Sequence, residues 1–243
     1  MAAPRTILVT GAASGIGLSC AERLMAQGDR VAALDAKAIS LAGGDSLLPL
    51  TVDVSDLAQC RRAVARTIER FGRLDALCHF AGIHSTASWE DLGEVEFARV
   101  LAVNVIGSFN MAKAAAEHMK QHGGGAIVLT SSGSIKVSGV GGGSGRGGPA
   151  YVASKAAITG LNQALARSLG RYDIRVNTVS PGATDTPMIA DYTPESRDAA
   201  ARRSFLGRIG RPEDVADVAI FLISDQARFI TGEIISVSGG GSV

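Results

Sequence analysis

The stretch Thr10-Gly11-Ala12-Ala13-Ser14-Gly15-Ile16-Gly17 follows a short apolar run, Arg5 to Thr10, and opens a helical pattern over Ile16 to Gln27. A glycine-rich turn between a strand and a helix lets a phosphate group approach the backbone, and the helix N-terminus offers it unpaired N–H groups. A tight turn without any ligand has the same composition. The turn alone favours, without proving, a dinucleotide site made by Gly11, Ser14, Gly15, Ile16 and Gly17.

Outward from this turn, short apolar runs alternate with helical patterns along the 243 residues. That alternation is typical of parallel strands joined by crossover helices. The sequence therefore predicts an α/β fold over residues 1–243: a single-domain Rossmann fold with a doubly wound, seven-stranded parallel sheet flanked by helices. The expected strands are Arg5–Thr10, Arg30–Asp35, Leu48–Val52, Ala76–Ala81, Ala126–Ser131, Ile174–Val179 and Ile234–Val237. The expected helices are Ile16–Gln27, Leu57–Phe71, Val95–Gln121, Ala150–Gly170 and Pro212–Ser224.

Two irregular stretches interrupt the alternation. Gly133 to Gly148 contains eight glycines in 16 residues, and Thr184 to Gly207 follows the sixth strand with only a weak helical pattern. Loops beyond the carboxyl ends of parallel strands are where open α/β sheets bind ligands. We therefore expect both stretches near a ligand, with residues 184–207 forming a substrate loop.

Composition argues against several classes of partner. The net charge of +1 and the absence of a dense Lys/Arg stripe argue against nucleic acid. The three cysteines, an odd number, favour free thiols in a reducing compartment. No apolar stretch in the sequence pattern approaches the roughly 18 residues of a membrane span, and no signal peptide fits before Arg5. We expect a cytoplasmic protein without a metal site or a membrane partner.

Two carboxylates follow expected strands. Asp35 closes the second strand, where a carboxylate can accept both hydroxyls of an adenosine ribose and repel a 2′-phosphate. This favours NAD over NADP, although Lys37 lies nearby, and a helix cap is the alternative role of Asp35. Asp53 could accept from an adenine amino group with Val54 against the ring edge, or serve only as an N-cap.

Tyr151 and Lys155 lie four residues apart at the start of an expected helix, so their side chains share one face. A fixed ammonium favours phenolate and can bring a phenol toward the pKa of a useful acid or base. Ser132, at the end of the fifth strand, can reach the same pocket and stabilise charge on a substrate oxygen. A half-buried tyrosine beside a solvated lysine is the alternative reading of the pair.

These motifs together resemble the short-chain dehydrogenase/reductase family over essentially the whole chain. The marks of the resemblance are the T-G-x-x-x-G-I-G turn, Asp53-Val54, Ala81-Gly82, Asn104, Ser132, Tyr151-x-x-x-Lys155, Pro181-Gly182 with Thr186, and Gly210-Arg211-Pro212-Glu213-Asp214-Val215-Ala216. The family likeness implies a nicotinamide cofactor, hydride transfer and a homotetramer.

The resemblance also implies roles for matching residues. Tyr151 would be the acid/base, and Lys155 would hold the nicotinamide ribose and lower the Tyr151 pKa. Ser132 would orient the substrate oxygen, and Asn104 would anchor a water in a proton relay. Further cofactor contacts would come from Ala81, Gly82, Pro181, Gly182, Thr184 and Thr186.

One departure from the family pattern lies after the fourth strand. The family usually reads Asn-Asn-Ala-Gly there, and this chain has His79-Phe80-Ala81-Gly82. Ala81 and Gly82 preserve the cofactor-facing backbone. We expect His79 to be structural rather than catalytic.

A second departure is the spacing of 19 positions between Ser132 and Tyr151 (151 minus 132), with a Gly/Ser-rich insertion over residues 138–148. The insertion could cover the substrate or bulge outward, and its spacing does not decide which. It also leaves Ser131 and Ser134 as alternatives to Ser132, which we prefer.

The leading functional hypothesis is an NAD-dependent oxidoreductase that interconverts a secondary alcohol, or a cis-diol, with a ketone. An NADPH-dependent ketoreductase acting on 3-oxoacyl thioesters would share every catalytic residue. A dinucleotide-binding protein without turnover is a third class, disfavoured because none of the four catalytic residues is lost. An apolar substrate pocket, or ordinary packing, is indicated by Trp89, Val140, Met188 and Ile189.

Overall fold

The computed structural model describes residues 4–137 and 147–242. Within these residues the strands are β1 (Thr6–Thr10), β2 (Arg30–Asp35), β3 (Leu47–Thr51), β4 (Ala76–His79), β5 (Gly125–Thr130), β6 (Ile174–Pro181) and β7 (Ile234–Val237). They form one parallel sheet in the order β3-β2-β1-β4-β5-β6-β7. The chain moves outward from β1 to β3 and returns to β4 beside β1, so the carboxyl ends of β1 and β4 form the switch point where such sheets bind ligands.

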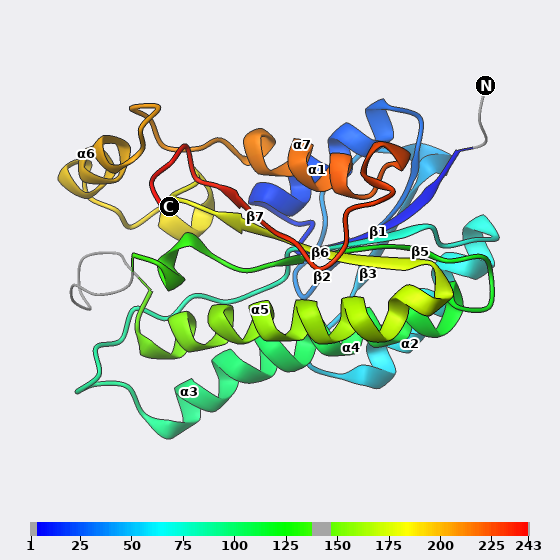
Figure 1. Ribbon diagram of the computed structural model, residues 1–243, viewed down its shortest axis with the longest axis horizontal. Coiled ribbons are helices and arrows are strands. Elements are labelled where there is room, and N and C mark those ends of the chain that lie inside the picture. The colour runs from blue at the N-terminus through cyan, green and yellow to red at the C-terminus, as the bar shows by residue number, and fades with distance from the viewer. Residues whose placement is uncertain (1–3, 138–146, 243) are drawn as a thin grey trace.

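Helices cover both faces of the sheet, as Figure 1 shows. The main helices of the described residues are α1 (Gly15–Ala26), α2 (Leu57–Phe71), α3 (Glu94–Leu101), α4 (Gly107–Met119), α5 (Pro149–Leu169), α6 (Pro194–Arg203) and α7 (Pro212–Leu222). Strand side chains alternate between the faces: Ile7 and Val9 join the core under α1 and α7, and Leu8 joins the core under α2, α4 and α5. Burial on both faces explains the near-continuous apolar runs in the sequence. The predicted doubly wound, seven-stranded single domain is confirmed.

The fourth strand is shorter than its pattern predicts. The sequence predicts Ala76 to Ala81, and β4 ends at His79. The Oγ1 of Thr10 accepts hydrogen bonds from the backbone N–H groups of Phe80 and Ala81, each at 3.1 Å. The Phe80 N–H is shared with the Thr10 backbone carbonyl at 3.3 Å, whereas the Ala81 N–H binds the side chain. Both bonds hold the segment after β4 beside the glycine-rich turn.

The expected helix Val95–Gln121 is divided into α3, a π-helical turn over Ala102–Ile106 and α4. The turn carries Asn104, which is fully buried. The backbone carbonyl of Asn104 accepts from the Ser108 hydroxyl at 2.6 Å, inside the following helix. π-helical turns are short irregularities that recur at functional sites. The position of Asn104 in this turn therefore favours a functional role for it.

The continuous helical run Glu94–Met119 spans 26 residues and is long and apolar enough, by length and composition alone, to cross a membrane. The expectation that no stretch approaches that length is wrong for this run. One side packs in the core under the sheet through Met111, Ala115 and Met119. Ile106 and Phe109 are exposed on the outer side. We regard the run as a helix that covers one face of the sheet, since core helices can be equally long and apolar.

The stretch expected to be an irregular substrate loop, 184–207, contains the helix α6. Thr193 caps this helix by accepting the N–H of Ser196 at 3.2 Å, and Pro194 occupies its first turn. α6 lies at the end of the molecule that also holds the carboxyl ends of β6 and β7 (Figure 1).

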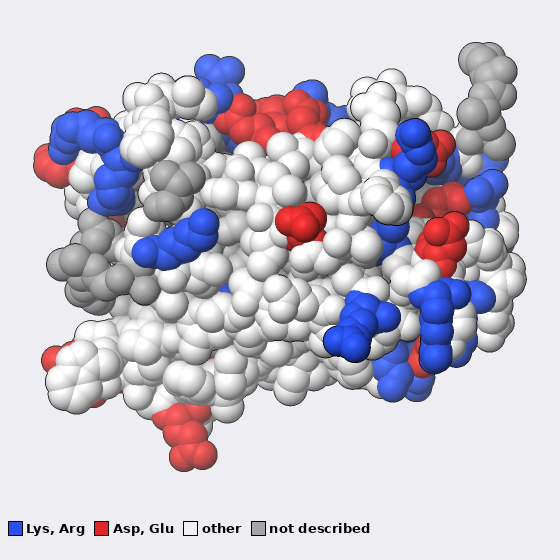
Figure 2. Space-filling model, in the orientation of Figure 1, with Lys and Arg blue, Asp and Glu red and all other residues white. Residues whose placement is uncertain are grey.

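Charges are spread over the surface without a dominant sign. Figure 2 shows Lys and Arg interspersed with Asp and Glu around a broad uncharged area, and no continuous basic surface lies on this face. This distribution fits the net charge of +1.

Candidate active site

A cleft of about 1330 Å³ opens at the carboxyl ends of the strands. Sites for one small ligand are typically about 300–1,000 Å³, so this cleft has room for two molecules side by side. It is lined by all of the predicted cofactor residues: Gly11, Ser14, Gly15, Ile16, Gly17, Asp35, Asp53, Val54, Ala81, Gly82, Tyr151, Lys155, Pro181, Gly182, Thr184 and Thr186. Ser132 also lines it, whereas Asn104 is not among the lining residues.

The glycine-rich turn has the geometry that phosphate binding requires. Gly11 and Gly15 have φ values of +69° and +56°, which side chains other than glycine rarely adopt. A Cβ atom added to Gly17 would lie 2.2 Å from the Gly11 carbonyl oxygen. Ser14 caps α1 without a side-chain hydrogen bond, and no acidic residue stands in the first turn. The N–H groups at the start of α1 are therefore available to an anion, which fits the pyrophosphate of a dinucleotide.

Asp35 stands at the end of β2 with its carboxylate in the cleft. Its Oδ2 accepts the N–H of Ala13 at 3.1 Å, and its Oδ1 accepts the N–H of Lys37 at 2.9 Å. Each carboxylate oxygen retains a further lone pair. Asp35 is thus held toward the glycine-rich turn and can still accept hydroxyl hydrogens from a ribose.

Asp53 follows β3 and forms a local turn. Its Oδ1 accepts both the N–H and the hydroxyl of Ser55, at 2.9 and 2.7 Å. The N-cap of α2 is Asp56, which accepts from Ala58 and Gln59, so the alternative reading of Asp53 as that cap is wrong. The neighbouring Val54 is buried and lines the cleft.

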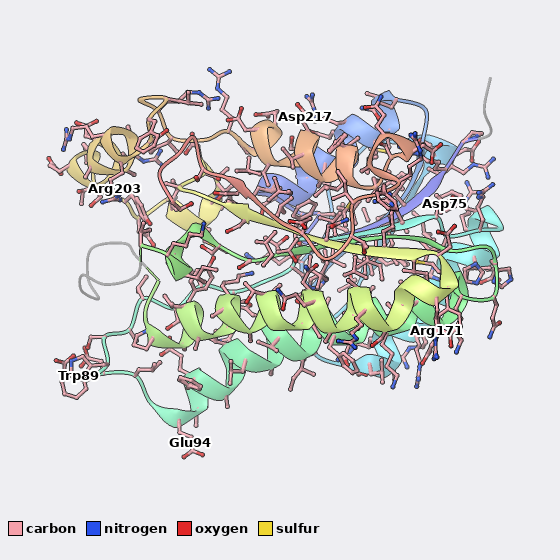
Figure 3. All side chains as sticks on the ribbon, viewed as in Figure 1. Asp75, Trp89, Glu94, Arg171, Arg203 and Asp217 are labelled. Atoms are coloured by element: carbon pink, nitrogen blue, oxygen red, sulfur yellow. The ribbon has the colours of Figure 1, made fainter. Side chains whose placement is uncertain are left out.

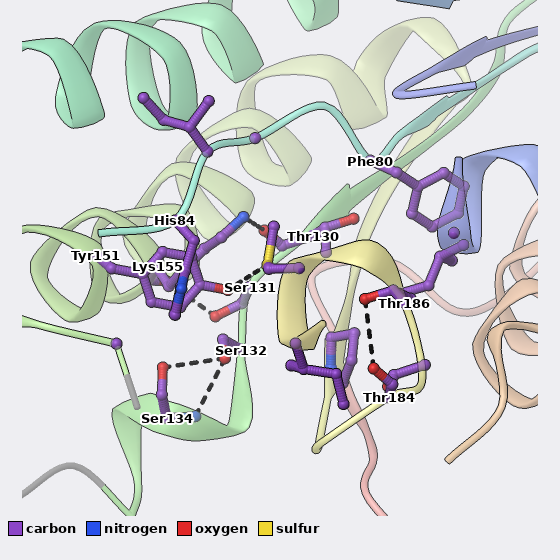
Figure 4. A pocket seen from close by; sticks show the side chains of 18 of the residues that line it. Phe80, His84, Thr130, Ser131, Ser132, Ser134, Tyr151, Lys155, Thr184 and Thr186 are labelled. Carbon is purple, nitrogen blue, oxygen red and sulfur yellow. Dashed lines mark hydrogen bonds between the residues drawn. The ribbon is translucent and has the colours of Figure 1, made fainter. Parts of the chain in front are cut away.

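Tyr151 and Lys155 lie one turn apart near the start of α5, and both are buried. The Lys155 Nζ lies 5.8 Å from the centre of the Tyr151 ring and donates to the Thr130 carbonyl at 3.0 Å. Lys155 is only 4% exposed, which excludes the alternative of a solvated lysine beside a half-buried tyrosine. The two side chains share the floor of the cleft, as Figure 4 shows.

The structure distinguishes the three neighbouring serines. The Ser132 side chain lies near enough to the Tyr151 hydroxyl to oppose the rise of its pKa. Ser131 donates its hydroxyl to the Lys155 carbonyl at 2.8 Å, and Ser134 donates its hydroxyl to the Ser132 Oγ at 3.0 Å (Figure 4). Ser132 is therefore the serine placed beside Tyr151, as preferred from the sequence.

Burial dominates the ionisation of the pair. Burial raises the pKa of Tyr151, and the Ser132 side chain opposes that rise. The sequence predicts a Tyr151 pKa lowered by Lys155; the direction is opposite because the phenol is desolvated and the ammonium is directed at a backbone carbonyl. Burial also lowers the pKa of Lys155 to about 8.

The Lys155 pKa makes stability depend on pH. Between about 8 and the ordinary value of 10.5 the folded chain binds fewer protons at this site than the unfolded chain, so the free energy of unfolding rises with pH. Relative to a Lys155→Met variant, we expect wild type to gain roughly 2 to 3 kcal/mol across that window, at about 1.36 kcal/mol per pKa unit. Denaturant unfolding of both proteins over the same pH range measures this, and a constant difference would contradict it.

Asn104 is fully buried and forms hydrogen bonds through both ends of its carboxamide. Its Oδ1 accepts the N–H of Ile83 at 2.8 Å, and its Nδ2 donates to the Ile83 carbonyl at 3.0 Å and to the Ser154 hydroxyl at 2.9 Å. A Cβ atom added to Gly82 would lie 3.2 Å from Asn104 Oδ1 and 3.4 Å from Lys155 Nζ. Asn104 therefore lies close to Lys155 and ties the segment after β4 to α5.

The residues expected at the nicotinamide end follow β6. Pro181 ends this strand, Thr184 donates its hydroxyl to the Gly182 carbonyl at 3.1 Å, and Thr186 donates to the Thr184 carbonyl at 3.3 Å. A Cβ atom added to Gly15 would lie 3.0 Å from the Thr186 methyl carbon, so this segment meets the glycine-rich turn across the cleft.

Two histidines follow the fourth strand in different roles. His79 is buried, and its Nδ1 lies 2.9 Å from the Thr10 hydroxyl, in agreement with the expected structural role. His84 was not predicted as a site residue, yet it lines the cleft with its ring centre 4.6 Å from that of Tyr151. The only sequence signal for His84 is its position just after the cofactor-facing Ala81-Gly82.

The predicted apolar pocket residues separate into two groups. Met188 and Ile189 line the cleft, and the Met188 sulfur lies 4.0 Å from the Tyr151 hydroxyl. Trp89 also borders the cleft but is 78% exposed and projects from a loop tip, as Figure 3 shows. Val140 and residues 138–146 of the Gly/Ser-rich insertion lie outside the described residues.

The family model described as enoyl-(acyl carrier protein) reductase matches residues 11–242. An uncharacterised short-chain type dehydrogenase/reductase of Sinorhizobium fredii is 37% identical over 248 residues, which cover 97% of this chain and 96% of the relative. The chain belongs to the short-chain dehydrogenase/reductase family. Membership confirms the resemblance and identifies the chain as an oxidoreductase that binds a nicotinamide dinucleotide and acts on a small molecule.

Other family members resemble this chain over similar lengths. A 3α-hydroxysteroid dehydrogenase of Mediterraneibacter gnavus is 37% identical over 245 residues, covering 97% of this chain and 96% of the relative. The crystal structure of a 3-ketoacyl-(acyl-carrier-protein) reductase of Brucella melitensis, complexed with NADH, superposes with a TM-score of 0.86 at 30% identity and covers 98% of each chain. The family therefore includes relatives of this chain with different substrates.

Proposed function

We propose that this short-chain dehydrogenase/reductase is an NAD-dependent enzyme that interconverts a secondary alcohol, or a cis-diol, with a ketone, with Tyr151 as acid/base. The observation that carries the proposal is the arrangement at the cleft floor. The Ser132 side chain acts on the Tyr151 hydroxyl, and Lys155 lies one helical turn away in the same cleft. These are the groups that acid/base chemistry at a carbinol oxygen requires.

The residues divide the work of the reaction. The hydroxyls of Tyr151 and Ser132 would bind the substrate oxygen, so that charge developing on it is stabilised by two donors. In oxidation Tyr151 takes the hydroxyl proton, and in reduction it returns that proton. A bound nicotinamide would supply the hydride acceptor for oxidation and the hydride donor for reduction. The buried Lys155 ammonium keeps positive charge beside the phenol, and Asn104 fixes the backbone next to it.

NAD is proposed as the cofactor because of Asp35. Its carboxylate stands in the cleft beside the glycine-rich turn, where it can bind ribose hydroxyls and would repel a 2′-phosphate. Ala13 and Ala36 offer no cationic side chain there. The Brucella melitensis relative bound to NADH provides additional support.

A second candidate is an NADPH-dependent ketoreductase acting on 3-oxoacyl thioesters. It is favoured by the likeness to a 3-ketoacyl reductase and by Lys37, which lines the cleft next to Asp35. A binding protein without turnover is disfavoured because Asn104, Ser132, Tyr151 and Lys155 are all present.

Two measurements test the proposal. Titration of the purified protein with NAD and with NADP should give tighter binding of NAD. A panel of secondary alcohols and diols, followed by NADH absorbance, should reveal oxidation. Tighter binding of NADP, with turnover only of 3-oxoacyl thioesters, would favour the second candidate instead.

We also propose a cytoplasmic homotetramer. The outer side of the run Glu94–Met119 exposes Ile106 and Phe109, which a subunit contact would cover. Cys20, Cys60 and Cys78 are free and buried, as expected in a reducing compartment.

A further inference from the structure

His84 is fixed in place next to the candidate acid/base. Its ring packs edge-on against Tyr151, with ring centres 4.6 Å apart and an interplanar angle of 79° (Figure 4). The preceding residue, Ile83, is held at both its N–H and its carbonyl by the buried Asn104 carboxamide. The imidazole is therefore supported on two sides, as a recognition residue must be.

The two ring nitrogens of His84 are available for hydrogen bonds to a ligand. Among residues 4–137 and 147–242, neither ring nitrogen of His84 makes a hydrogen bond, and the side chain lines the cleft. Burial and the nearby Lys155 ammonium lower the pKa of His84. The ring is thus neutral at neutral pH and offers one N–H donor and one nitrogen acceptor.

Apolar side chains and the phenol of Tyr192 lie around Tyr151 on the substrate side. The Met188 sulfur lies 4.0 Å from the Tyr151 hydroxyl, and Ile83 and Ile189 line the same cleft. Ser132 is already committed to the oxygen that Tyr151 would protonate. His84 is in ring contact with Tyr151 and presents its two ring nitrogens to a second polar atom of the substrate.

We propose that His84 selects substrates that carry a second oxygen, a hydroxyl or a carbonyl, on the carbon next to the reacting carbinol. This substrate class, vicinal diols and hydroxyketones with an apolar body, rests on the proposed alcohol oxidation. A neutral imidazole can accept from a hydroxyl or donate to a carbonyl, and its lack of charge gives no preference for a carboxylate. A substrate without the second oxygen leaves the ring unpaired in the filled cleft, which costs binding in the transition state.

The test compares matched substrates that differ only in that oxygen. Vicinal cis-cyclohexanediol is paired with cyclohexanol, and phenylethanediol with phenylethanol. For each pair the ratio of kcat/KM, diol over mono-alcohol, is measured in wild type, His84→Phe and His84→Gln. His84→Phe keeps the ring contact with Tyr151 but has no polar atom, so the ratio should fall at least tenfold. His84→Gln keeps a donor and an acceptor and should retain part of the preference.

The matched control is His122→Phe, the same replacement at an exposed site after α4 outside the cleft lining, which should leave the ratio as in wild type. A wild-type ratio near or below one, failure to turn over any diol of the set, or an unchanged ratio in His84→Phe would overturn the role of His84. The proposed function stands in these cases if mono-alcohols are oxidised with NAD. If no alcohol of either kind is oxidised, both proposals fail together.

Discussion

Replacing Tyr151 with phenylalanine is expected to lower kcat for alcohol oxidation by about two to four orders of magnitude. The change removes one oxygen and leaves the ring that packs against His84 and lies 5.8 Å from the Lys155 ammonium. Without the phenol no group in contact with the carbinol oxygen can take its proton, and general acid–base catalysis contributes about 10²–10⁴-fold. Steady-state rates at saturating NAD give kcat, and a titration shows that the variant still binds the cofactor.

The control for this experiment is Tyr172→Phe, which removes the same atom elsewhere. Tyr172 packs beside the core near the end of α5 and does not line the cleft. Its variant should turn over within about twofold of wild type, because surface substitutions away from special features have small effects. If Tyr151→Phe kept more than a tenth of the wild-type kcat, Tyr151 would not be the acid/base.

The fold could be predicted because its signal is local and repeated. The inner strands β1, β2, β4, β5 and β6 are mainly buried on both faces, so each has the sequence of an apolar run. The turn Gly11–Gly17 marks the first strand-to-helix connection. The ends of strands are less predictable where side chains accept hydrogen bonds from backbone N–H groups. β4 ends at His79, where the Thr10 hydroxyl accepts the N–H groups of Phe80 and Ala81 and shares the first with the Thr10 carbonyl. No sequence pattern encodes that arrangement.

The sequence predicts which residues form the candidate site better than it predicts their ionisation. Tyr151, Lys155 and Ser132 meet as their spacing and strand positions indicate. The direction of the Tyr151 pKa shift depends on how much water the folded chain excludes, which spacing does not contain. His84 was missed for a similar reason: its contact with Tyr151 joins residues 67 positions apart (151 minus 84), and no motif marks it.

Neutralising Asp35 should have the second large effect, on the choice between cofactors. At about 4 Å and an effective dielectric near 20, two unit charges repel by about 4 kcal/mol, and a phosphate carries at least one. We therefore expect wild type to bind NAD about 10²–10³-fold more tightly than NADP. In Asp35→Asn, which keeps the shape and one oxygen acceptor, the two affinities should come within about tenfold of each other.

The ratio of the two dissociation constants isolates the charge from other effects of the substitution. Asp35 also accepts the N–H groups of Ala13 and Lys37, and losing one of these bonds weakens both cofactors alike. The matched control is Asp53→Asn, a carboxylate in the same half of the cleft that sits at the end of β3. Because any contact of Asp53 with adenine is common to both cofactors, its variant should keep the wild-type ratio. An Asp35→Asn ratio as large as that of wild type would remove the basis for assigning NAD, since the discrimination would then come from elsewhere in the cleft.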